Sequence, residues 1–307
     1  MTEIGKKWLP DKAVSEGAAG YHNAVINASW NNDNLYELVS LMKPEVNEND
    51  TIVDFGAGTG ASSLCILNHI KLKFNLWLVD NSPAWLAKAY EILRNNQNVS
   101  YFILEKKDNS YLTLDRIIGN NAANMVVSAN TFHLVPNLKD VFEGIAKSLK
   151  KKGMFIFQSG NIIREGRVNG MLMIEDTIHK VHDIAIDIIK NESLFKIYRE
   201  NINERIKAEE EQRKLIFPFP RHIDIYLNAL KHAGFLHEPI TYKTIRVKYD
   251  DWMKFLRVKR LQAGILPEIG SRYPSEKEEH DRDKIITMAA NRLFDELKNN
   301  NPFADKE

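Results

Sequence analysis

The sequence predicts an α/β fold in which helices sandwich a mainly parallel sheet. Three observations lead to this prediction. Short apolar runs alternate with helical spacing between residues 51 and 158, a rhythm typical of parallel crossover units. A glycine-rich turn joins the first apolar run to the helical pattern that follows it. Helical patterns also flank this region, at 1–45 and 164–216, and are expected to form a cap.

The first half of the chain is expected to alternate strands and helices after an N-terminal helical segment. That segment ends at Lys43-Pro44, because proline stops a helix. The expected strands are 51–55, 74–80, 99–104, 124–128 and 153–158, with helices at 62–69, 84–93 and 138–149. Ligands of such sheets bind outside the carboxyl ends of the strands.

The second half begins with a long charged helical stretch, 171–216, which ends at a Phe-Pro-Phe-Pro run. The patterns after it predict helices at 222–234, 252–261 and 285–297, a strand at 240–247 and a weakly marked strand past 264. We expect Trp252 to pack against the sheet. The chain then divides into an N-terminal lid (1–45), an α/β core (46–163), a helical cap insertion (164–216) and the C-terminal part of the core (217–307).

The composition is that of an ordinary globular protein, with 42 basic and 41 acidic residues and a formal charge of +1. Proteins that grip a phosphate backbone usually carry a basic excess, so nucleic acid is not the expected partner. The single cysteine, Cys65, cannot form an intramolecular disulfide, which suits a reducing compartment. Neither a signal-peptide pattern nor a run of about 20 apolar residues is present. We therefore expect a cytoplasmic protein without membrane association.

The strongest motif runs from Ile52 to Gly60 and reads I-V-D-F-G-A-G-T-G. Glycines after a strand let the backbone turn tightly and approach a ligand. The helix that follows offers free N–H groups to an anionic group. Asp54 at the strand end suits a cationic ammonium better than a diphosphate. Asp80 ends the second strand, where a carboxylate can accept hydrogen bonds from both ribose hydroxyls.

With these residues, the run 51–160 resembles the class I (Rossmann-like) S-adenosylmethionine-dependent methyltransferases. The resemblance implies a seven-stranded sheet and S-adenosylmethionine as the cofactor. It places the methionine part near Gly56, Ala57 and Gly58. Further cofactor contacts are expected from the residues at the other strand ends and in the lid: Tyr21, Asp80, Asn81, Asp108, Asn109 and Asn130. Asn124 stands where many members begin the fourth strand with an aspartate.

Candidates for substrate chemistry follow the fourth strand, where His133 could act as a general base because its ordinary pKa is about 6.5. The alternative is that His133 only forms a structural hydrogen bond. His22, beside Tyr21, is expected to be solvated. His179 and His182 share a helix face, but a metal would need a third ligand, so no metal is expected. A histidine there could instead face the substrate.

The expected activity is methylation of an O, N or C atom of a small molecule. A homodimer is one assembly that the protein could form. Three alternatives remain. The acceptor could be a protein or nucleic acid. A nicotinamide-dependent oxidoreductase is the second, since Gly56-x-Gly58-x-x-Ala61 loosely fits that fingerprint. The third is a relative that binds the cofactor but catalyses another reaction.

Overall fold

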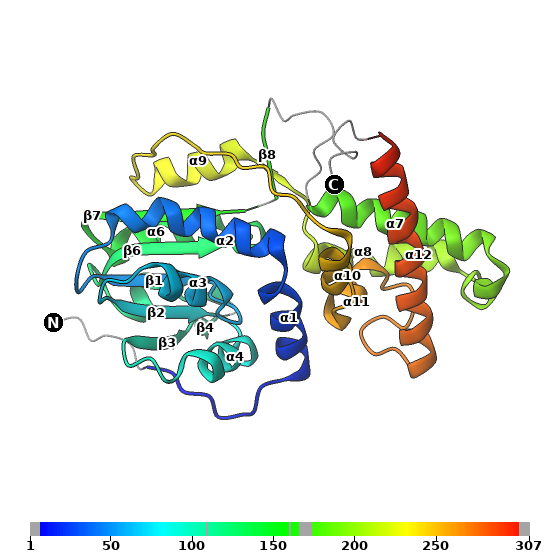
Figure 1. Cartoon of the computed structure of the whole chain (residues 1–307), viewed down its shortest axis with the longest axis horizontal. Helices are drawn as coiled ribbons and strands as arrows, with labels where there is room; N and C mark the ends of the chain where they lie inside the picture. The colour runs from blue at the N-terminus through cyan, green and yellow to red at the C-terminus, as the bar shows by residue number, and fades with distance from the viewer. Residues whose placement is uncertain (1–6, 109, 160, 166–173, 301–307) are drawn as a thin grey trace. The chain divides into compact units, whose positions relative to one another are not determined.

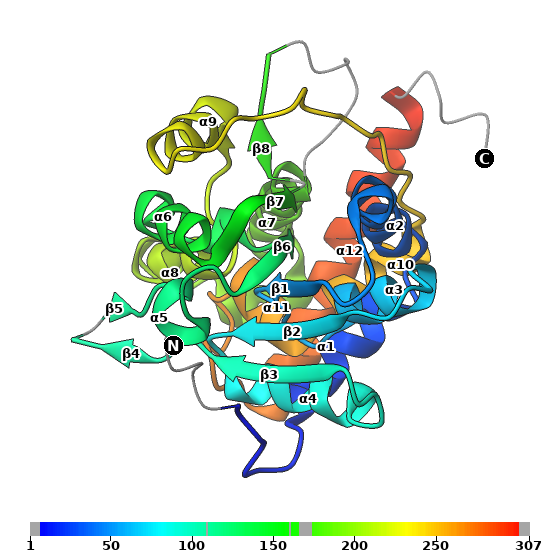
Figure 2. The same cartoon turned by 90° about the vertical axis from the view of Figure 1, so that its left-hand side faces the viewer.

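The computed structural model describes residues 7–108, 110–159, 161–165 and 174–300. The chain separates into two compact units. Unit 1 comprises Met1–Ser159 and His222–Val247, and unit 2 comprises Gly160–Arg221 and Lys248–Glu307. Unit 1 contains a sheet with helices on both faces, and unit 2 is mainly helical (Figures 1 and 2).

The sheet of unit 1 has five parallel strands in the order β3-β2-β1-β6-β7 (Figure 2). Their bounds are β1 Thr51–Phe55, β2 Asn75–Asp80, β3 Val99–Ile103, β6 Ala123–Ala129 and β7 Leu149–Gln158. All five residues of β1 are buried, as expected for a central parallel strand covered on both faces. Strand order reverses beside β1, between β2 and β6. This is where open parallel sheets bind their ligands.

Helices cover both faces of the sheet (Figure 2). One face carries α2 (Ser29–Met42), α3 (Ala61–His69) and α4 (Pro83–Leu93), and the other carries α5 (Leu114–Ile118), α6 (Leu138–Ser148) and α9 (Ile223–His232). Helix α1 (Glu16–Ile26) precedes them, and η1 (Lys43–Glu45) ends α2 at Pro44. A short hairpin, β4 (Lys106–Lys107) and β5 (Ser110–Tyr111), follows β3.

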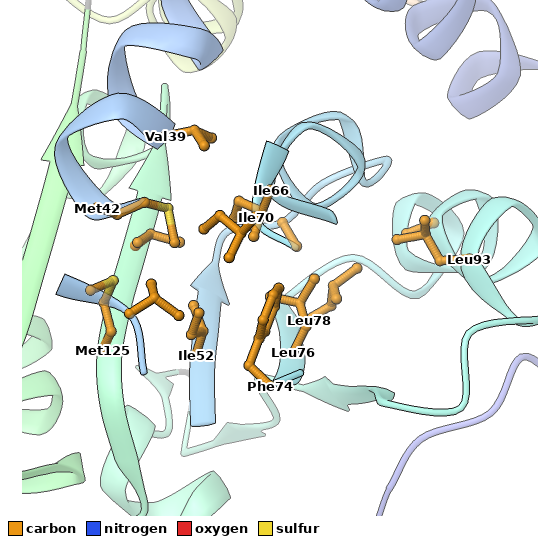
Figure 3. Close-up of a cluster of buried hydrophobic side chains, with 14 of the residues drawn as sticks. Val39, Met42, Ile52, Ile66, Ile70, Phe74, Leu76, Leu78, Leu93 and Met125 are labelled. Atoms are coloured by element: carbon orange, nitrogen blue, oxygen red, sulfur yellow. The ribbon is translucent and has the colours of Figure 1, made fainter. Parts of the chain in front are cut away.

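A cluster of aliphatic side chains forms the core on the α2–α4 face (Figure 3). Ile52, Leu76 and Leu78 from the strands meet Ile66 of α3 and Met42 of α2, and all five are fully buried. Each such side chain contributes about 1.5–3 kcal/mol relative to its exposed state. This burial holds the helices that flank the glycine loop against the sheet.

Aromatic rings fill the opposite face. Phe132, in the short helix η2 (Phe132–Leu134), is fully buried and has its ring centroid 5.0–5.5 Å from those of Phe55, Phe142, Phe155 and Phe157. Edge-to-face and offset pairs at such distances each add about 0.5–1.5 kcal/mol. Phe132 therefore anchors the segment that directly follows β6.

The α/β class is confirmed, but the expectation of seven strands is wrong, since the described sheet has five. Residues 240–247 form no strand. Ile240, Tyr242 and Val247 are 39–50% exposed, and strand propensity is realised only where a partner strand and a packed face are available. The region past 264 is helical where it is regular, in α11 (Lys259–Ile265) and α12 (Glu276–Asn300).

The helices of unit 2 come from two separate stretches of chain. They are α7 (Ile174–Asn191), η3 (Ser193–Tyr198), α8 (Ile202–Ile216), α10 (Tyr249–Leu256), α11 and α12, with the two-residue strands β8 (Ile162–Ile163) and β9 (Arg221–His222) at the boundary. The expected helical stretch 171–216 is broken between Asn191 and Ile202, where η3 intervenes and Asn201 has a φ of 52°. Residues 248–307 thus group with 160–221, not with the sheet as the expected division had it. Trp252 packs on Phe294 of α12, with ring centroids 5.0 Å apart.

The two histidines of α7 that were considered as metal ligands have other neighbours. His182 Nε2 lies 3.0 Å from Glu268 Oε1, which Arg213 also contacts at 3.1 Å. The His179 ring stacks on Phe219, with centroids 5.1 Å apart. Within the described ranges, no cluster of three or more His, Cys, Asp or Glu is placed to hold a metal ion. None of the described helices is long and apolar enough to cross a bilayer.

Candidate functional site

The glycine loop follows β1 and is fastened to the end of β2. The N–H groups of Gly56 and Ala57 donate to the Val79 carbonyl, at 2.8 and 3.2 Å. Gly56, Gly58 and Gly60 have φ values of +72°, +56° and +84°, a region that costs other residues about 1–2 kcal/mol. A side chain at any of these three positions would therefore strain the loop backbone.

Gly56 also lies against the segment after β6. A Cβ atom at Gly56 would stand 2.3–2.8 Å from three side-chain atoms of Thr131, far inside van der Waals contact. The Thr131 hydroxyl donates to the carbonyls of Ala129 and Gly56, at 3.0 and 3.3 Å. Ser128 Oγ donates to the Phe55 carbonyl at 2.7 Å. The carboxyl ends of β1 and β6 are thus held together, and the position of Gly56 has no room for a side chain.

Asp80 connects the glycine loop to the start of α4. Its Oδ2 accepts from the Gly58 N–H and its Oδ1 from the Ser82 N–H, both at 2.8 Å. Asp80 is 8% exposed. Each carboxylate oxygen has two lone pairs, so the same group can still accept from a ligand hydroxyl. Asn81, between Asp80 and Ser82, is exposed.

Asp54 lies fully buried beneath the loop. Its Oδ2 accepts from the hydroxyls of Ser62 and Ser63 at 2.5 and 2.6 Å, while its Oδ1 has no hydrogen-bond partner in the described part of the chain. Burial raises the pKa of this carboxyl to about 6, against the opposing effect of the two serine hydroxyls. The buried anion is therefore costly above pH 6, and a cation near Oδ1 would stabilise it.

Helix α1 contributes two neighbouring side chains near the loop. The Tyr21 ring lies 4.5 Å from the Trp85 ring, and Trp85 comes within 3.3 Å of the Cβ position of Gly58. His22 is only 6% exposed, and its Nδ1 lies 3.1 Å from Thr59 Oγ1. The expectation that His22 is solvated was wrong, because α1 turns this side chain toward the loop.

The segment after β6 carries the candidate base. Asn130 adopts a left-handed conformation with φ of 52°, and its N–H donates to the Gln158 carbonyl at 3.1 Å. His133 is half-buried in η2, and its Nδ1 lies 3.2 Å from Ser159 Oγ at the end of β7. Asn130 and His133 thus stand at the carboxyl edge of the sheet, as the sequence predicted for residues that follow a parallel strand.

Asp108 and Asn109, which were expected to contact the cofactor, are placed differently from the other candidates. Asp108 lies exposed in the turn of the β4–β5 hairpin, and Asn109 lies outside the described residues. The residues that directly follow β3 are Leu104, whose N–H donates to the Asp80 carbonyl at 2.9 Å, and Glu105, whose carbonyl accepts from Leu112 at 2.8 Å. The structure therefore does not bring Asp108 into the hydrogen-bonded network around the glycine loop.

The residues present fit a ligand with a cation, an anion and a diol. The unpartnered buried Oδ1 of Asp54 suits an ammonium, and the start of α3 suits a carboxylate. Asp80 suits the two hydroxyls of a ribose. Two carboxylates beside the same loop would repel a diphosphate. The sequence analysis gave no role at this loop to four further residues of the arrangement: His22, Thr59, Trp85 and Thr131. They meet the rest of the site through contacts between segments that are distant in the sequence.

The parallel sheet with its ligand loop at the point of strand reversal defines a Rossmann-like α/β protein. Residues 46–213, more than half of the chain, match the family described as Methyltransferase domain. The chain therefore belongs to this methyltransferase family, whose cofactor is S-adenosylmethionine.

Individual relatives are distant. A highly reducing polyketide synthase, g433, from a Fusarium species is 24% identical over 135 residues, covering 42% of this chain and 5% of the synthase. Phosphoethanolamine N-methyltransferase 2 of Haemonchus contortus is 14% identical, with a TM-score of 0.49, covering 90% of this chain and 53% of that one. The YcgJ protein of Bacillus subtilis is 12% identical, with a TM-score of 0.46, over 80% of this chain and 87% of that one.

Proposed function

We propose that the protein transfers the methyl group of S-adenosylmethionine to an O, N or C atom of a small-molecule metabolite. The observation that carries the proposal is the contact between Gly58 N–H and Asp80 Oδ2 at 2.8 Å, because it joins the glycine loop to the acid that we assign to the ribose. Bound S-adenosylmethionine supplies an electrophilic methyl group on a sulfonium. Proximity and alignment of the acceptor can contribute about 7–11 kcal/mol to such a step.

The chain's own residues would bind and orient the reactants. Gly56, Ala57 and Gly58 would lie along the methionine part, and Asp54 would hold its ammonium. Asp80 and Asn81 would hold the ribose, and Tyr21 and Asn130 would flank the cofactor from α1 and from the end of β6. No step requires a metal ion from the protein.

A small acceptor is supported by two observations. The charges nearly cancel, at +1 over the chain, so there is no basic excess for a nucleic acid backbone. The relative from Fusarium is a polyketide synthase, which supports a role in secondary metabolism. A homodimer and a cytoplasmic location remain predictions.

We expect His133→Ala to lower turnover by about 10²–10⁴-fold, the usual contribution of a positioned general base. Affinity for S-adenosylmethionine should stay within about twofold, because the Nδ1 of His133 lies 3.2 Å from Ser159 Oγ, at the end of β7. Single-turnover rates and calorimetric affinities would be measured once an acceptor is found. Unchanged turnover would show that alignment suffices and would remove the base assignment.

Calorimetric titration with S-adenosylmethionine, S-adenosylhomocysteine and NAD tests the proposed function directly. We expect micromolar dissociation constants for the first two and no binding of NAD. NAD binding alone would overturn the proposal in favour of an oxidoreductase. Tight binding of both adenosyl compounds, without methyl transfer to any acceptor of a broad small-molecule panel, would favour a relative with another reaction.

A further inference from the structure

His22 is a buried titratable side chain for which the proposed methyl transfer has no use. It lies on α1 and reaches Thr59 of the glycine loop, 37 residues away, with 3.1 Å between Nδ1 and Oγ1. Both partners are almost completely buried, at 6% and 3% exposure. Thr59 stands between Gly58 and Gly60, so this contact joins α1 directly to the part of the loop expected to hold the cofactor.

The neighbouring residue reinforces the same attachment. The Tyr21 ring packs on Trp85, which in turn lies over Gly58. Two consecutive residues of α1 therefore touch the loop, one directly and one through α4. A change in the position of α1 would move the surroundings of both Gly58 and Thr59.

The electrostatic surroundings of His22 favour its neutral form. Burial lowers the pKa of this imidazole most, and Lys88 of α4 lowers it further. A hydrogen bond with the Thr59 main chain and the charge of Glu91, also on α4, act in the opposite direction and are weaker. Because the pKa is lowered, the stabilisation of the docked helix is complete above the ordinary value of about 6.5 and declines as the pH falls below it.

We propose that His22 is a positioning residue of the cofactor loop: its neutral imidazole fastens α1 to Thr59, and protonation loosens α1 and weakens cofactor binding. The second half of this inference rests on the proposed function, whereas the attachment of α1 does not. Asp54 also titrates near pH 6, so the test must separate the two groups.

His22→Asn is the decisive variant, because an amide can keep a hydrogen bond to the Thr59 hydroxyl but does not titrate. Hydrogen exchange of the full-length, ligand-free protein would follow the amides of residues 18–26 at pH 7.5 and 5.5, corrected for the chemical exchange rate. We expect the wild-type protection factors to fall at least fivefold at pH 5.5 and those of His22→Asn to stay within twofold. Equal pH dependence in both proteins would overturn the proposal.

Calorimetric affinity for S-adenosylmethionine tests the consequence over the same pH range. We expect wild-type affinity to fall about three- to tenfold more between pH 7.5 and 5.5 than that of His22→Asn. The Asp54 contribution is common to both proteins and cancels in the comparison. Thr59→Val should loosen α1 already at pH 7.5, and Thr59→Ser should behave as wild type. Failure of the wild type to bind at pH 7.5 would overturn the proposed function, while the exchange data would still decide the role of His22.

Discussion

Gly56→Ala is expected to abolish measurable cofactor binding and to lower the free energy of unfolding by at least about 2–3 kcal/mol. The φ of +72° costs an alanine about 1–2 kcal/mol. The new methyl would also stand 2.3 Å from Thr131 Cγ2, and overpacking of this kind usually costs a further ~1–3 kcal/mol. Urea denaturation and calorimetric titration would measure the two effects.

Two other glycines provide matched controls. Gly234 has a similar φ of +83° but open space at its Cβ position, so Gly234→Ala isolates the backbone cost of about 1–2 kcal/mol. Gly20 lies in α1 with nothing near its Cβ position, so Gly20→Ala should be neutral or stabilising by up to about 1 kcal/mol. If Gly56→Ala proved no more destabilising than Gly234→Ala, the contact with Thr131 would not restrict the loop.

Asp80→Ala is expected to weaken S-adenosylmethionine binding at least tenfold, which corresponds to about 1.4 kcal/mol. The variant loses the acceptor for ribose hydroxyls. It also leaves the Gly58 and Ser82 N–H groups without the partner that each has at 2.8 Å. Titration of a variant shown by circular dichroism to be folded gives the affinity.

A comparison of adenosine with 2′-deoxyadenosine separates ribose recognition from loop distortion. Wild-type protein should prefer adenosine by at least fivefold, and Asp80→Ala should lose this preference. Asp33→Ala is the matched control, because it removes an exposed carboxylate of α2, and the preference should persist. Retention of both the affinity and the preference in folded Asp80→Ala would remove Asp80 from the site.

Patterns confined to neighbouring residues were predictable from the sequence. The strands of the core and the helices between them follow from local periodicity, and the loop from Gly56 to Gly60 follows from residues adjacent in the chain. The same holds for Asp80, which ends a strand parallel to β1 and therefore emerges at the same edge of the sheet. These features depend on the backbone preferences of a few consecutive residues, which any single sequence displays.

Contacts between distant segments could not be predicted in this way. His22 looked like a solvated residue beside Tyr21, because nothing in α1 shows that Thr59 lies against it. Residues 240–247 have the composition of a strand, but a strand also needs a partner edge, and that partner is chosen by the whole fold. Trp252 has the spacing of a sheet-packing helix, yet its neighbour is Phe294 of α12.

The sequence by itself therefore determined the α/β class, the glycine loop and the acid at Asp80, since each is encoded within one strand–turn–helix unit. The tertiary structure alone decided that the described sheet has five strands. It also decided that Thr131 closes over Gly56, and that His22 joins α1 to the loop. The physical reason is that burial and close packing are properties of residues brought together from across the chain, and only the folded arrangement specifies which of them meet.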